Sequence, residues 1–392
     1  MKSVLKNSLK MKSPFTLLLI TLVSLSVNVS CGRRSDNTSK DDAVIERIVG
    51  EMSLKEKVCQ MFILRPESLV CPEDALSMDV TGLGEGMAVF FSEYPVGGFC
   101  LFPKNIVSPA QLVKFTADLH SLSPKPLLCV DEEGGRVARI ANTEGFGLKK
   151  FESMTALASG NDPQKVCDAS LYIGTYVKEY GFDIDFAPVA DVNTNPENIV
   201  IGPRAFSDNP RTAATKVVSY MQGLKEAGVT GCLKHFPGHG DTKNDTHTGY
   251  AASTKTWDEM EACEMVPFKA GIAAGAELIM IAHIAAPNVT GTDVPSTMSP
   301  VIIKEKLRGS LGYEGLIITD AVEMGAITQK YSSAEAAVGM VNAGVDIILM
   351  PSDFIQAVDG IIKAVGEGRI SEKRIDESVC RILSLKQKKG LL

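Results

Sequence analysis

The sequence predicts an α/β protein, a (β/α)8 barrel of TIM type that forms a single domain over residues 47–392. Eight short runs of residues are almost continuously apolar, as expected for parallel strands that are covered on both faces. Most runs are followed by enough residues for a crossover helix. The count of eight favours a closed barrel over a doubly wound open sheet, which produces the same local signals. The runs are 60–64, 97–102, 127–131, 183–189, 231–235, 278–283, 316–320 and 345–350.

The segments around these runs carry helix signals. Ser53 and Glu56 have the spacing of a capping box, in which a hydroxyl and a carboxylate satisfy opposing backbone amides. Apolar positions recur at helical spacing over 372–389, and a further helix is expected over 162–179. The first run is therefore expected to follow a helix, and the last to precede one.

Residues 1–30 have the pattern of a signal peptide. Four lysines, with no acidic residue, precede an apolar run over 15–29 that is too short to span a hydrocarbon core of about 30 Å. The alternative is a buried N-terminal helix.

Cys31 stands directly after this run and begins a polar stretch, so residues 31–46 are interpreted as a tether with a lipidated cysteine. The boundary resembles the lipobox of bacterial lipoproteins, although Asn28 occupies a position where leucine is usual. Ordinary cleavage and an unmodified thiol are the alternatives. A diacylated cysteine anchors a chain without a spanning helix. We therefore expect an exported protein, on the periplasmic or cell-surface side, that meets the membrane only through this lipid.

The charge balance argues against nucleic acid as a partner. Removal of residues 1–30 takes four lysines from the 40 basic residues, which leaves 36 against 47 acidic residues and a net charge of −11. Such a chain is repelled by phosphate backbones. We expect a monomer.

The eight cysteines after Cys31 are scattered without a C-x-x-C pair, which favours small buried apolar residues over disulfides or metal ligands.

Polar residues gather where the apolar runs end. In a parallel barrel the carboxyl ends of the strands share one face, and barrel enzymes build their active sites there. Seven titratable residues at or just past the ends of different runs are therefore expected to meet. They are Asp131, Asp185, Asp191, Lys234, His235, His283 and Asp320.

The stretch 234–247, K-H-F-P-G-H-G-D-T-K-N-D-T-H, holds three of the five histidines. A purely structural loop rarely concentrates so many titratable groups. A metal site is the competing interpretation, because His235 and His239 are four residues apart and Asp241, Asp245 and His247 could add ligands. Proline and glycine between the two histidines break helical geometry, and no glutamate completes an H-E-x-x-H pattern.

This stretch resembles the signature of the β-N-acetylglucosaminidases of glycoside hydrolase family 3, in which Thr246 is usually a serine. The resemblance implies that His247 is the general acid/base and that Asp245 orients it. An imidazole with a pKa of about 6.5 suits both roles near neutrality. The segment 317–324, I-I-T-D-A-V-E-M, resembles the family's nucleophile motif and assigns Asp320 as nucleophile. The alternative for Asp320 is a cap on the following helix.

The resemblance also implies four sugar-binding residues. Asp131 matches the aspartate of the family's D-x-E-G-G-R-V segment, Arg204 lies in a matching R-x-F-S segment, and Lys234 with His235 matches its K-H pair. As alternatives, Arg204 pairs with Asp185 or Asp191.

Further residues near these motifs are expected to support the site without contacting the sugar. Glu133 and Arg136 are expected to form a structural ion pair. His239 and Asp241 are expected to position the loop. Trp257 is expected to pack at the start of a helix.

The resemblance implies a retaining exo-β-N-acetylglucosaminidase that acts on peptidoglycan-derived or other amino-sugar glycans, with no metal and no cofactor. Two other functions remain open from the sequence. One is a β-N-acetylglucosaminide phosphorylase, because a neutral imidazole does not repel an incoming phosphate. The other is a surface lipoprotein that binds glycans without cleaving them, although such a protein has no need of both a nucleophile and an acid.

Overall fold

The computed structural model describes residues 34–70, 79–160, 162–243, 245–246 and 249–392. Contacts divide the chain into Met1–Ala43 and Val44–Leu392, and the fold below is that of the second unit. The expected signal peptide and Cys31 lie outside the described residues. Helix α1 (Arg34–Glu51) covers most of the expected tether, which is helical from Arg34 onward. Its role as a tether stays a prediction.

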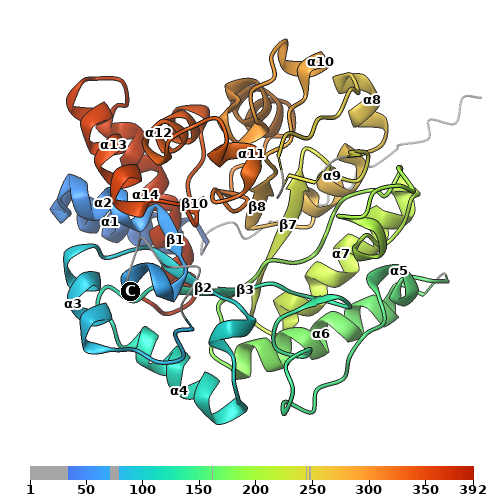
Figure 1. The fold of residues 1–392 in the computed structure, drawn as a ribbon, viewed down its shortest axis with the longest axis horizontal. Coiled ribbons are helices and arrows are strands. Elements are labelled where there is room, and N and C mark those ends of the chain that lie inside the picture. Colours follow the sequence, from blue (N-terminus) through green and yellow to red (C-terminus); the bar gives the residue numbers. More distant parts are fainter. Residues whose placement is uncertain (1–33, 71–78, 161, 244, 247–248) are drawn as a thin grey trace, which may run out of the picture. The chain divides into compact units, whose positions relative to one another are not determined.

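Eight parallel strands form the centre of the fold, in the order β10-β1-β2-β3-β6-β7-β8-β9. A parallel bridge between Ile318 of β9 and Ile347, the residue just before β10, closes the ring, so the predicted barrel is confirmed (Figure 1). Each strand overlaps one predicted run; seven lie within their runs, and β7 extends one residue beyond its run at each end. The strands are β1 (Phe62–Leu64), β2 (Gly98–Leu101), β3 (Leu127–Val130), β6 (Ile184–Asp185), β7 (Thr230–Phe236), β8 (Leu278–Ile281), β9 (Leu316–Thr319) and β10 (Ile348–Leu349).

Helices surround the barrel, as Figure 1 shows. The capping box is confirmed, because the Ser53 amide donates to Glu56 Oε2 at 2.7 Å and the Glu56 amide donates to Ser53 Oγ at 3.3 Å. The two further predicted helices are α6 (Gln164–Glu179) and α14 (Glu372–Lys388). The other helices of eight or more residues are α3 (Glu85–Glu93), α4 (Pro109–His120), α7 (Pro210–Glu226), α9 (Met265–Ala273), α12 (Ser333–Ala343), α13 (Phe354–Gly366) and the π-helical segment Val301–Ser310. The shorter ones are α2 (Leu54–Gln60), α5 (Met154–Leu157), α8 (Trp257–Ala262), α10 (Pro287–Thr290) and α11 (Gly325–Thr328).

Strand residues are buried on both faces, which explains why the runs are continuously apolar rather than alternating. Trp257 packs against the core at the start of α8, as predicted, with Lys306 Nζ 4.9 Å from its ring centre. Seven cysteines fall in the described part of the chain; all are free and five are buried. Within that part, no helix has both the length and the apolar character that a membrane span requires.

A small antiparallel hairpin interrupts the alternation of strands and helices just after β3. It consists of β4 (Glu132–Gly134) and β5 (Val137–Ala138). Gly134 and Gly135 have φ of 88° and 63°, a conformation that side chains with a Cβ disfavour, and they turn the chain back on itself. The hairpin therefore starts at the carboxyl end of a barrel strand, where it shapes the entrance to the site.

Candidate active site

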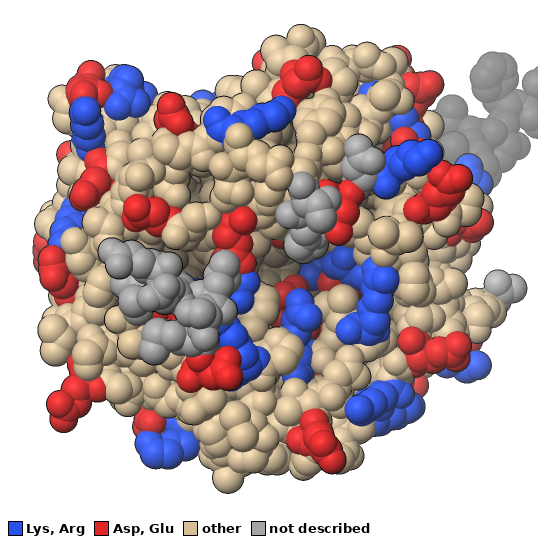
Figure 2. Space-filling model, in the orientation of Figure 1, with Lys and Arg blue, Asp and Glu red and all other residues tan. Residues whose placement is uncertain are grey.

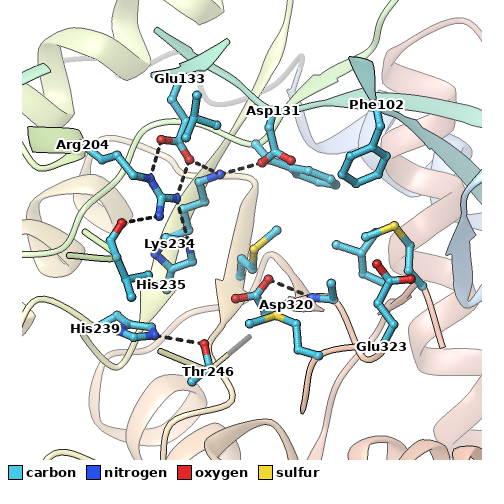
Figure 3. Close-up of a pocket in the computed structure, with 18 of the residues that line it drawn as sticks. Phe102, Asp131, Glu133, Arg204, Lys234, His235, His239, Thr246, Asp320 and Glu323 are labelled. Carbon is cyan, nitrogen blue, oxygen red and sulfur yellow. Dashed lines mark hydrogen bonds and ion pairs between the residues drawn. The ribbon is translucent and has the colours of Figure 1, made fainter. Parts of the chain in front are cut away.

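A pocket of about 340 Å³ lies at the carboxyl ends of the barrel strands. Figure 2 shows acidic and basic side chains around a hollow on this face, and Figure 3 shows the side chains that line it. The four predicted binding residues and the predicted nucleophile all line this one pocket. They are Asp131, Arg204, Lys234, His235 and Asp320.

Lys234 joins two carboxylates at the floor of the pocket. Its Nζ lies 2.7 Å from Asp131 Oδ1 and 2.6 Å from Glu133 Oε1. Arg204 grips Glu133 with two parallel hydrogen bonds, Nε to Oε2 at 2.8 Å and Nη2 to Oε1 at 2.7 Å. The fork of the guanidinium matches the carboxylate, so the array is fixed in geometry as well as in charge.

These groups keep their charges in spite of burial. Burial opposes ionisation of Asp131 and Glu133, but Lys234 and the neighbouring arginines outweigh it, and the pKa of each carboxyl lies below its usual value. Burial likewise opposes a charge on Lys234, and the two carboxylates outweigh it and raise the pKa of the amine. The pocket therefore presents fully charged donors and acceptors, which make the stronger hydrogen bonds to hydroxyl groups.

Asp191 holds two histidines at the carboxyl end of β7. Its Oδ2 lies 2.7 Å from His235 Nδ1, and its Oδ1 accepts from the His239 amide at 2.5 Å. An Nδ1–H directed at Asp191 leaves His235 Nε2 as an acceptor, 3.4 Å from Arg204 Nη2. The His235 ring is thereby fixed in one orientation against the pocket.

Close packing explains the two glycines of the loop after β7. A Cβ on Gly240 would lie 2.0 Å from the carbonyl oxygen of Val192. A Cβ on Gly238, whose φ is 120°, would lie 2.5 Å from Glu264 Cγ. Neither position has room for a side chain, so the loop follows one path across the barrel end.

His239 and Asp241 hold this loop, as predicted. His239 bonds through both ring nitrogens, Nδ1 to Thr242 Oγ1 at 2.6 Å and Nε2 to Thr246 Oγ1 at 3.1 Å. Asp241 Oδ1 accepts from Thr194 at 3.0 Å and lies 3.2 Å from Lys255 Nζ.

The two residues expected to carry acid/base chemistry lie on either side of Thr246. Thr246 is buried, lines the pocket, and accepts from the Ala326 amide of α11 at 3.1 Å through its carbonyl oxygen. Asp245 is half-buried and directly precedes it. His247 lies outside the described residues. The roles of Asp245 and His247 stay predictions.

Asp320 directly follows β9 and lies in the pocket, across from Lys234 in Figure 3. Its amide donates to the Ile281 carbonyl at 2.8 Å, and its Oδ1 accepts from the Ala321 amide at 2.8 Å. The helix-cap alternative is wrong, because α11 begins only at Gly325 and Met324 precedes it. The carboxylate thus stands in the pocket instead of closing a helix.

Comparison with known proteins agrees with this geometry. Residues 54–385 match the model of the glycosyl hydrolase family 3 N-terminal domain. The chain belongs to glycoside hydrolase family 3. The predicted resemblance to the β-hexosaminidases of this family and the prediction of a glycoside hydrolase are both confirmed.

Relatives include a β-hexosaminidase A of Pseudoalteromonas piscicida, 33% identical over 79% of this chain and 56% of that protein. A β-hexosaminidase of Xylella fastidiosa is 36% identical over 70% of this chain and 85% of that protein. A solved family 3 β-N-acetylglucosaminidase from Paenibacillus sp. FPU-7 is 34% identical, with a TM-score of 0.80 over 87% of this chain and 63% of that one. The chain thus spans less than two thirds of two of these three proteins.

One expected ion pair of this family 3 chain is wrong, and so is the alternative pairing of Arg204. Glu133 does not pair with Arg136, because the glycine turn of the hairpin sends Arg136 outward, where its Nη2 donates to the carbonyls of Ile199 and Val200. Arg204 pairs with Glu133 rather than with Asp185 or Asp191.

Three of the seven expected rim residues lie beneath the pocket. Asp185 is fully buried, its Oδ1 accepts from the Glu132 amide at 2.9 Å, and burial raises its pKa well above the usual value. Asp191 supports the two histidines described above. His283 is buried, with Nδ1 2.9 Å from Thr297 Oγ1 and Nε2 2.9 Å from the Ala321 carbonyl next to Asp320.

Several side chains of the pocket were not predicted, among them Arg65, Phe102, Arg139 and Glu323. Arg65 stacks on Phe102, with its guanidinium carbon 4.0 Å from the ring centre, and pairs with Glu323. Arg139 reaches Asp131, Nη2 to Oδ2, at 3.4 Å. Arg65 and Phe102 directly follow β1 and β2, so the strand-end rule applied to every run would have found them. Spacing alone gives no signal for Arg139, which lies eight residues after Asp131 and is folded back toward it by the hairpin.

The geometry of His235 and His239 bears on the metal interpretation. Their ring centres are 6.1 Å apart, and both rings are held by Asp191 or by threonine hydroxyls. Among the residues that the structure describes, no group of three or more His, Cys, Asp or Glu side chains is arranged to hold a metal ion.

Proposed function

We propose that the chain is a retaining exo-β-N-acetylglucosaminidase, with Asp320 as nucleophile, His247 as general acid/base and Asp245 as the residue that orients it. One observation carries the proposal. Asp320 shares a single pocket of about 340 Å³ with the charged array of Asp131, Glu133, Lys234 and Arg204. A pocket of this size suits one terminal sugar, and the names of the family 3 relatives support the amino-sugar class.

In this proposal the reaction takes two steps. The Asp320 carboxylate attacks the anomeric carbon while protonated His247 gives its proton to the leaving oxygen, so that the glycosidic bond breaks as the glycosyl-enzyme bond forms. Neutral His247 then takes a proton from water, whose oxygen attacks the same carbon and releases Asp320. Two displacements at one carbon retain its configuration.

The charged array binds the sugar in both steps. Its carboxylates accept from hydroxyls and Lys234 donates to them, while Asp320 and the acid/base act at the other end of the ring. Because the array is held by its own ion pairs, it needs no rearrangement when the substrate enters.

An activity panel tests this function directly. Aryl N-acetylglucosaminides and aryl glucosides are given to the wild type, Asp320→Asn and His247→Ala, with and without phosphate. We expect cleavage of the N-acetylglucosaminides by the wild type, loss in Asp320→Asn, and a loss in His247→Ala that is smaller for activated phenols, which need less protonation. His120→Gln is the matched control, because His120 bonds to Asp183 outside the described pocket, Nε2 to Oδ2 at 3.0 Å. Retained activity in Asp320→Asn contradicts the assignment.

We also propose export and lipid anchoring through Cys31, with peptidoglycan-derived or other amino-sugar glycans as substrates and a monomer as the working state. The basic and apolar leader over residues 1–30, directly before Cys31, supports the export and the anchor. Membrane fractionation of wild type and Cys31→Ser tests the anchor, and light scattering of the detergent-free variant tests the monomer. Equal membrane recovery of both chains contradicts the anchor.

A further inference from the structure

His239 is a buried histidine of the pocket wall that the proposed reaction leaves without a task. It is 1% exposed and lies beside the pocket with both ring nitrogens bonded to threonine hydroxyls. A histidine with no vacant ring nitrogen cannot protonate a leaving group. Its side chain reaches Thr246, which stands between Asp245 and His247 in the sequence.

Two threonine hydroxyls hold the His239 ring, one at each nitrogen. Thr242 Oγ1 lies 2.9 Å from the His239 carbonyl oxygen and 2.6 Å from His239 Nδ1. Nε2 lies 3.1 Å from the Thr246 hydroxyl oxygen, and because each hydroxyl can donate or accept, either neutral tautomer of His239 completes both bonds. Burial lowers the pKa of His239, in agreement with a neutral ring.

Thr246 is held from two directions. Its side chain meets His239, and its carbonyl oxygen accepts from the Ala326 amide at 3.1 Å, in the helix that follows the strand of Asp320. His239 in turn is fixed through its amide to Asp191, which also orients His235. One chain of contacts therefore runs from a sugar-binding histidine to the residue between the two acid/base candidates.

We infer that the His239–Thr246 contact positions the acid/base segment, so that His239 is a positioning residue for proton transfer. The inference rests on the proposed function. A general acid must stand within about 2.6–3.2 Å of the oxygen it protonates, and a displacement of about 1 Å can lower the rate about 10²-fold. A loop with two glycines has no strand or helix to supply that precision, and the buried contact supplies it instead.

Two matched pairs of variants test the contact. Thr246→Val removes the hydroxyl at nearly constant shape, and Thr246→Ser keeps it. His239→Asn places an amide near the position of Nδ1 and loses the hydrogen bond to Thr246. His239→Gln places its amide near the position of Nε2 and keeps that hydrogen bond. Each is assayed with an alkyl and a dinitrophenyl N-acetylglucosaminide, and its thermal midpoint is measured.

We expect Thr246→Val and His239→Asn to lower kcat/KM on the alkyl substrate about 10²-fold, with a much smaller loss on the dinitrophenyl substrate. Thr246→Ser and His239→Gln should stay near the wild type. The double variant His239→Asn/Thr246→Val should be no worse than either single variant, since both remove one contact. A merely structural role predicts equal losses on both substrates together with a lower thermal midpoint, and that result overturns the inference.

The wild type and His247→Ala separate this inference from the proposed function. A wild type that cleaves neither substrate overturns both. If the wild type is active and His247→Ala shows the leaving-group signature while Thr246→Val does not, the proposed function stands and the positioning role is wrong.

Discussion

Glu133 pairs with two cations of the pocket, although the sequence motif assigned sugar binding to Asp131 instead. It is 2% exposed and is shared by Lys234 and Arg204, which approach its carboxylate from different elements. A buried carboxylate is tolerated there because both cations compensate the loss of hydration. Removing its charge therefore leaves two buried cations with fewer partners.

Glu133→Gln should lower the free energy of unfolding by about 3–5 kcal/mol, the range for one partner removed from a buried pair. Urea unfolding at neutral pH measures this change. Glu367→Gln is the matched control, because Glu367 pairs with Arg369 on the surface, with side chains 45% and 50% exposed, where pairs contribute about 0–1 kcal/mol. Equal losses of unfolding free energy in the two variants would show that the Glu133 charge does not stabilise the buried array.

At the scale of elements, the loop after β7 links the binding array to the expected acid/base segment. Its path depends on Gly240, where a Cβ would meet the backbone of Val192 rather than the end of a flexible side chain. Backbone cannot move aside cheaply, so a side chain at this position displaces the loop itself.

Gly240→Ala should therefore reduce kcat on an alkyl N-acetylglucosaminide by about 10²-fold or more, since it shifts the segment that carries the proposed acid/base. Gly366→Ala in α13 is the control, because nothing lies within 4 Å of the position that its Cβ would take and alanine favours a helix. Parallel assays and thermal midpoints separate the two effects. Full activity in Gly240→Ala would mean that the loop position does not limit proton transfer.

Strands were predictable at this scale, whereas the hairpin of β4 and β5 was not. Parallel strands buried on both faces leave a continuous apolar signature, and each of the eight strands overlaps one of the eight predicted runs. The hairpin consists of Glu132–Gly134 and Val137–Ala138, too short and too polar for a periodic signal. For this reason the sequence placed Asp131 and Lys234 correctly but mispaired Glu133 and missed Arg139.

Across the whole domain, the C-terminal helix closes the barrel at the end opposite the pocket. Asp346, just before β10, is fully buried and pairs with Arg308 at 2.8 Å and with two arginines of α14, Arg374 at 3.6 Å and Arg381 at 3.1 Å. The same helix carries Lys386, which is fully buried with its Nζ 2.7 Å from Gln60 Oε1. A neutral amide partner does not compensate the charge of a buried ammonium. We therefore expect this lysine to make the free energy of unfolding depend on pH.

Burial lowers the pKa of Lys386 from 10.5 to about 7 in the folded chain. Between these two values the unfolded chain binds a proton that the folded chain does not, so the contribution of Lys386 to stability rises with pH, by at most about 1.4 kcal/mol per pH unit. Below pH 7 both states are protonated and this slope disappears. Lys386→Met should remove the slope, whereas Lys388→Met, at an exposed side chain, should keep it. Urea unfolding from pH 6 to 10 measures the free energy of unfolding of the wild type and of each variant. The titration of other groups cancels in the difference between them. If the wild type and Lys386→Met show the same dependence on pH, the buried amine stays charged and the prediction is wrong.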